Sequence, residues 1–314
     1  MKKIREHRII VVTPAGRKAY LEILKTYILK DESIDEWILW DNCRLESDRI
    51  YIKNLAKNHT KIKIITQKST DGTNQAINQF YKTSSDKNVF YIKIDDDIVY
   101  LPEHFGQSLY NEALIDRYKY TYWSPLVVNN AICSWLLKYH SKLKIDASLM
   151  ASAACNTGWK SPEFAECLHK TFITAHRENT INLFHVPNFD ISLARFSINC
   201  IGFFGQEVAA LGDSFCPLDA DDEEYISAVL PSKTGRPGRI IGNIIVSHFS
   251  FFTQENYLIK TGVLNSYFNL INMRPIMPPI RIKKSFKQNI IYTLIRILKF
   301  ARSKQSTYSI GLDK

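Results

Sequence analysis

Short apolar runs alternate with amphipathic segments through the first part of the chain, which is the pattern of strands alternating with helices. The segment Arg8 to Val12 is mostly apolar, as expected for a central strand, and Thr13 to Gly16 then forms a turn into a helix. Because strands that alternate with helices form parallel sheets, the pattern predicts an α/β fold with a mostly parallel central sheet flanked by helices. The predicted strands are 8–12, 36–40, 61–66 and 90–94, and the predicted helices are 17–29, 47–58 and 72–84.

The segment from Phe90 to Leu101 ends an apolar strand on three consecutive carboxylates, Asp95, Asp96 and Asp97. Aspartate is a poor strand former, so the strand should end where these residues begin. Ligands of open α/β sheets bind beyond the carboxyl ends of the strands, where Asp95 and Asp97 would point if Asp96 faced the other way. Two carboxylates one residue apart suit a divalent cation that holds a diphosphate. The alternatives are a solvated loop or a helix cap, while an EF-hand is excluded because its glycine and later glutamate are missing.

The middle of the chain, from about Asn111 to Asn199, is rich in Trp, Tyr and Asn and shows only scattered helical periods. Such a segment is typical of insertions that shape a pocket for a second substrate. Its tryptophans, Trp123, Trp135 and Trp159, either stack on sugar rings or belong to the core.

A second acid cluster follows the middle segment. Asp219 is predicted to cap a helix from about Ala220 to Leu230, with acids in its first turn and Pro231 ending it. A basic loop rich in glycine and proline, 233–239, then leads into a strand that carries His248 near its end.

The end of the chain combines a proline-broken linker with an amphipathic segment. Residues 285–303 have helical periodicity, with a wide apolar arc opposite a basic side. This helix is expected either to lie on an anionic membrane surface or to dock on the core of the protein itself.

The chain has 314 residues and a net charge of +10, which favours anionic partners such as phosphorylated donors, anionic lipid or nucleic acid. Its six cysteines form no C-x-x-C pair, so neither a zinc site nor a disulfide framework is indicated. The N-terminal apolar run is shorter than in a signal peptide, and no apolar stretch reaches membrane-spanning length. A reducing cytoplasmic location is therefore expected.

Together these segments resemble the nucleotide-sugar-dependent glycosyltransferases of the GT-A fold, close to bacterial family 2-like enzymes of surface polysaccharide assembly. The resemblance covers roughly residues 8–260. It is carried by TPAGRK after the first strand, ILWDN, GTNQAIN, the DDD run, DDEEY and SHF. It implies a Rossmann-like fold with a D-x-D motif, a UDP-linked hexose donor and a Mn²⁺ or Mg²⁺ cofactor. On this resemblance, nucleotide binding falls to Thr13, Asp41, Asp95 and Asp96, and the metal to Asp95, Asp97 and His248.

The chemistry of glycosyl transfer explains why such residues would occur together. Negative charge grows on the departing diphosphate, and a divalent metal neutralises it. Lys233, Arg236 and Arg239 lie in the basic loop, which is expected either to close over the diphosphate or to be a solvated turn.

An inverting enzyme also needs a base for the acceptor hydroxyl. Asp221, Asp222 and Glu223 are the candidates, with Asp222 favoured and Asp221 second. The alternative is structural, because acids are favoured in the first turn of any helix.

The sequence interpretation divides the chain into a nucleotide-sugar-binding half, 1–110, an acceptor-binding and catalytic half, 111–270, and a linker with a basic tail, 271–314. The expected partners are a nucleotide-sugar donor, a glycan or lipid-linked acceptor and an anionic membrane at the inner face of the cytoplasmic membrane, with no nucleic acid. Two alternatives stay open, a metal-dependent nucleotidyltransferase and a non-catalytic membrane-surface binding protein.

Overall fold

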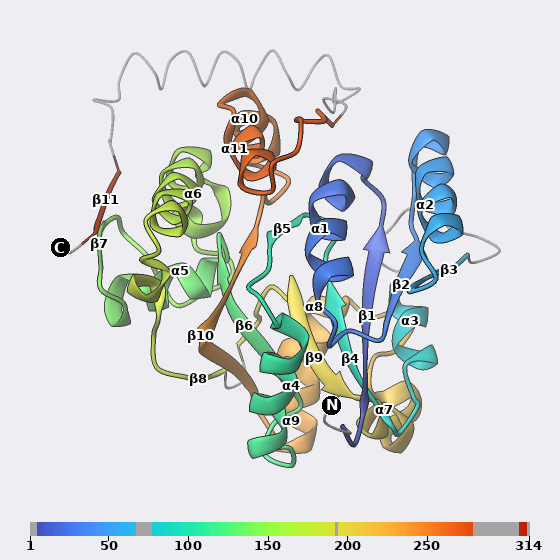
Figure 1. Ribbon diagram of the computed structural model, residues 1–314. Coiled ribbons are helices and arrows are strands. Elements are labelled where there is room, and N and C mark those ends of the chain that lie inside the picture. The colour runs from blue at the N-terminus through green and yellow to red at the C-terminus, as the bar shows by residue number, and fades with distance from the viewer. Residues whose placement is uncertain (1–4, 67–76, 192–193, 279–307, 313–314) are drawn as a thin grey trace, which may run out of the picture.

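The computed structural model describes residues 5–66, 77–191, 194–278 and 308–312. Within these residues, nine strands form one mixed sheet in which β3-β2-β1-β4-β9-β6-β10-β5 lie side by side, with β8 paired to β10. The strands β1 to β4, β6 and β10 run in one direction, while β5, β8 and β9 run in the other. The predicted α/β fold with a mostly parallel sheet and flanking helices is therefore confirmed (Figure 1).

The first part of the chain folds as the apolar pattern predicts. Strand β1 is buried along almost its whole length, as expected for a central strand covered on both faces. Of the predicted helix 72–84, only the end is described, because residues 67–76 lie outside the described residues. The elements are β1 Arg8–Ala15, α1 Lys18–Lys30, β2 Glu36–Asp41, α2 Glu46–Asn58, β3 Ile62–Ile65, α3 Asn78–Thr83 and β4 Val89–Ile94.

The middle of the chain adds helices and four strands, β5, β6, β8 and β9, that join the same sheet. Strand β9 inserts antiparallel beside β4, and β6 follows it. The elements are β5 Ile98–Tyr100, α4 Phe105–Ile115, β6 Tyr122–Val128, α5 Ala131–His140, β7 Leu143–Asp146, a π-helical turn Asn156–Lys160, α6 Pro162–Arg177, a 3-10 turn Ile181–Phe184, β8 Phe189–Ile191 and β9 Cys200–Phe204.

The remaining described elements bring the late strand β10 beside β6 and β5. They are α7 Gly205–Leu211, a 3-10 turn Gly212–Ser214, α8 Asp222–Glu224, a π-helical turn Tyr225–Val229, α9 Leu230–Thr234, β10 Gly238–His248, α10 Glu255–Lys260, α11 Val263–Leu270 and β11 Ser309–Leu312.

The prediction for the acidic helix is wrong at both ends. The cap is Asp221 rather than Asp219, because the Asp221 carboxylate accepts a hydrogen bond of 3.0 Å from the Glu224 amide. Pro231 does not end the helix, since it is the second residue of α9, which follows the π-helical turn Tyr225–Val229 without a break. The helix ends instead at Gly235, whose positive φ of 68° suits a helix C-terminus.

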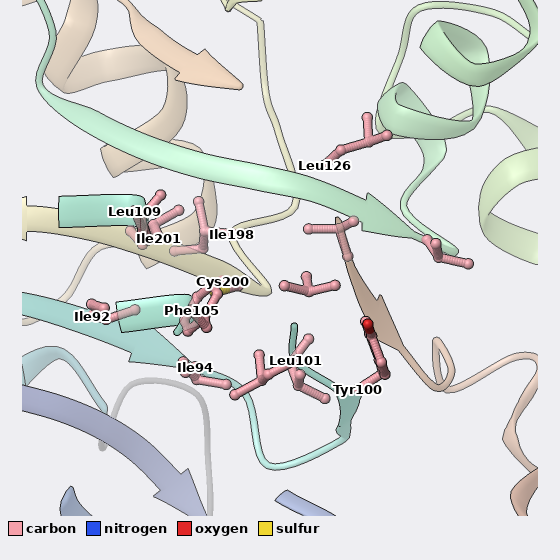
Figure 2. Close-up of a cluster of buried hydrophobic side chains, with 14 of the residues drawn as sticks. Ile92, Ile94, Tyr100, Leu101, Phe105, Leu109, Leu126, Ile198, Cys200 and Ile201 are labelled. Atoms are coloured by element: carbon pink, nitrogen blue, oxygen red, sulfur yellow. The ribbon is translucent and has the colours of Figure 1, made fainter. Parts of the chain in front are cut away.

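The core lies between the sheet and the helices that cover it. Figure 2 shows Ile92 and Ile94 of β4 close to Phe105 and Leu109 of α4, with Cys200 of β9 beside them. Trp123 is fully buried in this core, whereas Trp135 and Trp159 are partly exposed and pack against it.

The C-terminal strand β11 pairs antiparallel with β7, so the end of the described chain lies against the middle segment (Figure 1). The predicted amphipathic helix 285–303 lies outside the described residues. Among the helices that are described, none combines the length and apolar character needed to cross a bilayer.

Candidate active site

The three consecutive aspartates form the turn between β4 and β5. The Ile98 amide donates to the Asp95 carbonyl at 3.2 Å, which closes this turn at the carboxyl end of β4. Strand alternation therefore stops at Ile94, and the expectation that Asp96 faces away is wrong. All three carboxylates line one cavity of about 650 Å³, a volume within the range of about 300 to 1,000 Å³ that is usual for small-molecule sites.

Arg17 joins two of these carboxylates to a third from the second half of the chain. Its Nε donates to Asp96 at 3.0 Å, its Nη2 lies 2.9 Å from Asp97 Oδ2, and its Nη1 lies 3.3 Å from Glu255 Oε1. The Gly16 amide also donates to Asp96, at 2.9 Å. Burial acts to raise the pKa of Asp97, but Arg17 and His248 outweigh it and hold the pKa well below its usual range.

His248 ends β10 directly beside the acid turn, so the structure brings this predicted residue to the site. Its Nε2 lies 3.4 Å from Asp97 Oδ2, and its Nδ1 lies 3.2 Å from the Asn129 carbonyl. Donation from Nδ1 to a carbonyl fixes the ring orientation and leaves Nε2 facing the carboxylate, which is the usual arrangement of a metal-binding histidine. Burial would lower the pKa of His248, but Asp97 raises it by more.

Lys93 of β4 is a second basic residue of the site that the sequence interpretation did not select. Its buried ammonium lies 2.5 Å from Asp95 Oδ1 and donates to the Ile198 carbonyl at 2.8 Å. The Asn199 side-chain amide donates to Asp95 Oδ2 at 3.4 Å. A signal was present in the sequence, because Lys93 is the one charged residue within the apolar strand and lies two positions before the acid turn.

The acidic helix and its cap also contribute residues to the wall of the cavity. Asp221, Asp222 and Glu223 all line it. Arg195 pairs with Asp221 at 3.1 Å and with Glu223 at 2.8 Å, whereas Asp222 accepts a hydrogen bond from the Tyr81 hydroxyl at 3.2 Å. Burial raises the pKa of Asp222, more than the nearby Lys93 ammonium lowers it. The two neighbouring carboxylates therefore have different environments. Asp221 caps the helix and pairs with an arginine, whereas Asp222 does neither.

Two residues expected to bind the nucleotide are buried beside the cavity rather than in its wall. Thr13 accepts a hydrogen bond of 3.0 Å from the Trp37 indole, and Asp41 accepts from the Cys43 amide and from Arg49, each at 3.1 Å. Their neighbours line the cavity instead. Asn42 is one of them, and its side-chain oxygen is buried without a hydrogen-bond partner among the described residues.

The basic loop does not line the cavity, and of the two alternatives for it this arrangement favours a turn away from the diphosphate. Lys233 lies in α9 and donates to the Tyr225 hydroxyl at 3.1 Å, Arg236 pairs with Glu207 at 2.5 Å, and Arg239 pairs with Asp190 at 3.2 Å. Arg239 is the second residue of β10 and His248 is its last, so a rise of about 3.3 Å per residue separates them by roughly 30 Å.

The cavity wall is acidic, in contrast to the net charge of +10 on the chain. Eight carboxylates and five basic groups line it. The acids are Asp95, Asp96, Asp97, Asp219, Asp221, Asp222, Glu223 and Glu255, and the basic residues are Arg17, Arg44, Lys93, Arg195 and His248. An anionic ligand would be repelled by this wall unless a cation accompanied it.

The donor chemistry of the acid turn fits a divalent cation, with carboxylate oxygens from Asp95 and Asp97 and an imidazole nitrogen from His248. Asp97 Oδ2 and His248 Nε2 are 3.4 Å apart, a separation that suits two ligands of one ion. Through the described part of the chain, however, no three such side chains stand close enough together to hold a metal ion. In this structure Arg17 pairs with Asp96 and Asp97, and Lys93 pairs with Asp95.

No protein-family model matches the chain, and no curated protein sequence matches it either. Several solved structures resemble it in fold. One is the mannosyltransferase PcManGT from Pyrobaculum calidifontis in complex with GDP-Man and Mn²⁺, with 11% identity and a TM-score of 0.47, covering 88% of this chain and 67% of the other. A second is the 4-diphosphocytidyl-2C-methyl-D-erythritol synthase from Anaerococcus prevotii, with 12% identity and a TM-score of 0.42, covering 85% and 96%. A third is TarS 1-349 from S. aureus, with 13% identity and a TM-score of 0.42, covering 83% and 66%.

Proposed function

We propose that this chain is a metal-dependent glycosyltransferase that moves a hexose from a nucleotide diphosphate donor to a glycan acceptor. The observation that carries the proposal is the acid turn at the carboxyl end of β4, which lies beside His248 and lines the same cavity of about 650 Å³ as Asp222. The site thus combines ligands for a cation with a separate, partly buried carboxylate, and glycosyl transfer uses both.

Asp95, Asp97 and His248 would hold Mn²⁺ or Mg²⁺. When bound, the ion would neutralise the charge that grows on the departing diphosphate. The charge of the cavity wall favours this cation, because eight acidic residues line it against five basic ones. Arg17, now paired with Asp96 and Asp97, is close enough to contribute a guanidinium to the same phosphates.

The nucleotide side of the site is assigned to the edge formed by β1 and β2, within the proposed donor half 1–110. Gly16 lets the end of β1 pack closely against the residue after β2, because a Cβ there would lie 3.3 Å from the Asn42 carbonyl oxygen. The unpartnered oxygen of Asn42 is positioned to accept from a base or ribose, in place of the buried Asp41. A UDP-linked hexose is the donor we propose, on the GT-A resemblance.

Asp222 is assigned as the base that accepts the proton of the acceptor hydroxyl, which makes the enzyme inverting. A raised pKa brings a carboxylate closer to the pKa range of an efficient general base. Asp221 is less suited, because its oxygens already accept from the Glu224 amide and from Arg195.

The acceptor is proposed to be a lipid-linked glycan of polysaccharide or lipopolysaccharide assembly, such as O antigen, met at the inner face of the cytoplasmic membrane. This proposal rests on the net charge of +10 and on the basic amphipathic sequence of 285–303. No nucleic acid partner is proposed.

The experiment is a screen of UDP-, GDP-, CDP- and dTDP-sugars with Mn²⁺, in which release of free nucleoside diphosphate is measured. Asp97→Asn should abolish release while the far-UV circular dichroism stays native. The matched control is Asp213→Asn, which removes an exposed carboxylate paired with Lys82 and should leave release unchanged. Full release by the Asp97 variant, or no release from any donor by the wild type, would contradict the proposal.

A metal-dependent nucleotidyltransferase is the second candidate. It is favoured by Gly16 and Arg17, which directly follow β1 and line the cavity, as a phosphate-binding signature would. The same screen separates the two, because a nucleotidyltransferase incubated with a nucleoside triphosphate and a sugar phosphate releases pyrophosphate.

A further inference from the structure

Phe252, four residues after His248, lines the cavity, yet 64% of it is exposed to solvent. Its ring meets Trp159 edge to face, with 5.7 Å between ring centroids. Trp159 does not itself line the cavity, is partly exposed and has the Lys160 ammonium 5.2 Å from its ring. The two rings thus place an apolar surface directly beside a polar cavity, an arrangement in which a ligand can contact both.

The backbone around Phe252 is held in place, so its exposure is built into the fold. Thr253 Oγ1 donates to the Trp159 carbonyl at 3.1 Å, which ties the loop to the π-helical turn. The Phe251 amide donates to Gln254 Oε1 at 3.1 Å, and the same oxygen accepts from the Asn129 side chain at 3.0 Å. The two rings therefore form a fixed platform.

Ser250 adds a polar group beside this platform. It lines the cavity and is only 4% exposed, but its hydroxyl has no hydrogen-bond partner anywhere in the described residues. A buried hydroxyl without a partner is costly to the folded protein, so a ligand that completes the hydrogen bond explains why it is there.

The position of the platform separates it from the nucleotide side. The Phe249 amide donates to the Asp97 carbonyl at 2.8 Å, so the loop that carries Phe252 begins on the β10 side of the acid turn. Asn42 follows β2, on the opposite side of β4 in the sheet order. A sugar transferred at the acid turn would therefore meet its acceptor on the Phe252 side.

We propose that Ser250, Phe252 and Trp159 form a saccharide subsite that binds a pyranose ring of the acceptor. This inference rests on the proposed function. The aromatic faces suit the apolar C–H face of a sugar, and the buried hydroxyl suits one of its hydroxyl groups. A lipid chain would have no use for the unpartnered hydroxyl of Ser250.

The test is saturation-transfer NMR on the intact chain with the methyl glycosides of glucose, galactose, mannose and N-acetylglucosamine as probes, with and without UDP and Mn²⁺. The wild type should bind at least one probe. Phe252→Ala should weaken that binding by roughly threefold to tenfold, the contribution expected from one aromatic contact.

The matched control is Tyr139→Ala. Tyr139 is 55% exposed, pairs with Trp135 at 5.4 Å and has the Lys138 ammonium 5.5 Å from its ring, yet it does not line the cavity. Its loss should leave glycoside binding unchanged. Equal binding by the wild type and the Phe252 variant, equal loss in the Tyr139 variant, or no binding of any probe overturns the subsite.

Ser250→Ala gives a second, independent signature. Removal of an unpartnered buried hydroxyl should raise the Tm of the free protein, by roughly 1 to 3 °C, while glycoside binding weakens. A raised Tm with unchanged binding would make the hydroxyl a packing defect and overturn its role. Loss of binding to phosphatidylcholine vesicles in the Phe252 variant, with glycoside binding intact, would make the occupant a lipid. Glycoside binding is measured without donor turnover, so failure of the subsite and failure of the proposed transferase give different results.

Discussion

Removal of the Arg17 guanidinium tests how much this cation stabilises the negatively charged acid turn. In Arg17→Gln, the carboxylates of Asp96, Asp97 and Glu255 would lose a shared cation, and His248 would be the basic group left beside Asp97. Breaking a buried ion pair by removing one partner costs about 3 to 5 kcal/mol. Because the Arg17 side chain is 25% exposed, we expect the lower end, about 3 kcal/mol, or a Tm lower by roughly 6 °C for a chain of this size.

The matched control is Arg195→Gln. Arg195 also pairs with three carboxylates and also lines the cavity, but its side chain is 43% exposed, and those of Asp221 and Glu224 are more than half exposed. Exposed pairs contribute about 0 to 1 kcal/mol, so its Tm should fall by roughly 2 °C or less. Both variants are compared with the wild type by thermal unfolding in EDTA.

Thermal unfolding is then repeated with Mn²⁺, to test whether a metal ion binds where the guanidinium was. An ion that binds only the folded state stabilises it by about 2.7 kcal/mol at a hundredfold excess over its Kd. The increase in Tm with Mn²⁺ should be larger in the Arg17 variant than in the wild type, because the arginine no longer competes for Asp97. The reasoning is refuted if Arg17→Gln is no less stable than Arg195→Gln in EDTA, or if Mn²⁺ raises the Tm of the wild type and the Arg17 variant equally.

Three further predictions concern other parts of the molecule. Asp222→Asn should lower kcat by at least about a hundredfold with donor affinity kept, because a base acts on the acceptor alone. His169 is buried with a pKa lowered to about 3, so the unfolded state binds more protons between that value and about 6.5, and stability falls as the pH falls through this window. Between pH 7.5 and pH 5, the free energy of unfolding, measured by urea denaturation, should therefore fall by about 2 kcal/mol less in His169→Gln than in the wild type. Leu294→Ser with Leu298→Ser should reduce sedimentation with anionic vesicles, because it removes apolar residues from the predicted tail helix while leaving β11 in place.

Each of these three has its own control. Glu224→Gln removes an acid of the same helix that pairs with Arg195, and a kcat as low as that of the Asp222 variant would make both effects structural. Parallel stability curves for the wild type and the His169 variant would show that other groups set the pH dependence. The tail variant is compared with the wild type on neutral vesicles, and equal sedimentation of both with anionic vesicles would remove the support for a membrane-bound tail.

The sequence was sufficient for the parallel half of the fold because its strands are apolar on both faces. Strand β1 is almost fully buried and β4 completely so, and runs of this kind can lie only in the centre of a covered sheet. The place of the acids followed for the same reason, since a buried strand cannot continue through Asp95. His248 was also predictable, because it ends an apolar strand.

The orientation of single side chains could not be predicted in the same way. Thr13 and Asp41 are each followed by a residue that lines the cavity. Successive side chains of a strand point to opposite sides, so a shift of one residue decides which of the two faces the cavity. The basic loop was misplaced because its charge suggested a phosphate, although Arg236 and Arg239 have acidic partners elsewhere in the chain. Arg17 was missed because its partner Glu255 lies 238 positions away, a distance over which no local pattern extends.

The charge distribution connects these misplaced and missed residues. Arg236 and Arg239 balance acids far from the cavity, so they do not reduce the excess of carboxylates in its wall. The positive net charge of the chain still draws an anionic ligand from solution, because the field of the whole protein acts at long range. At the wall, however, the local excess of acids dominates, since charges within a few Å interact through a lower effective dielectric than water. On the proposed function, a diphosphate donor would be drawn to the protein by its net charge but would bind at the acid turn only together with a cation, so we expect the metal to bind before the donor.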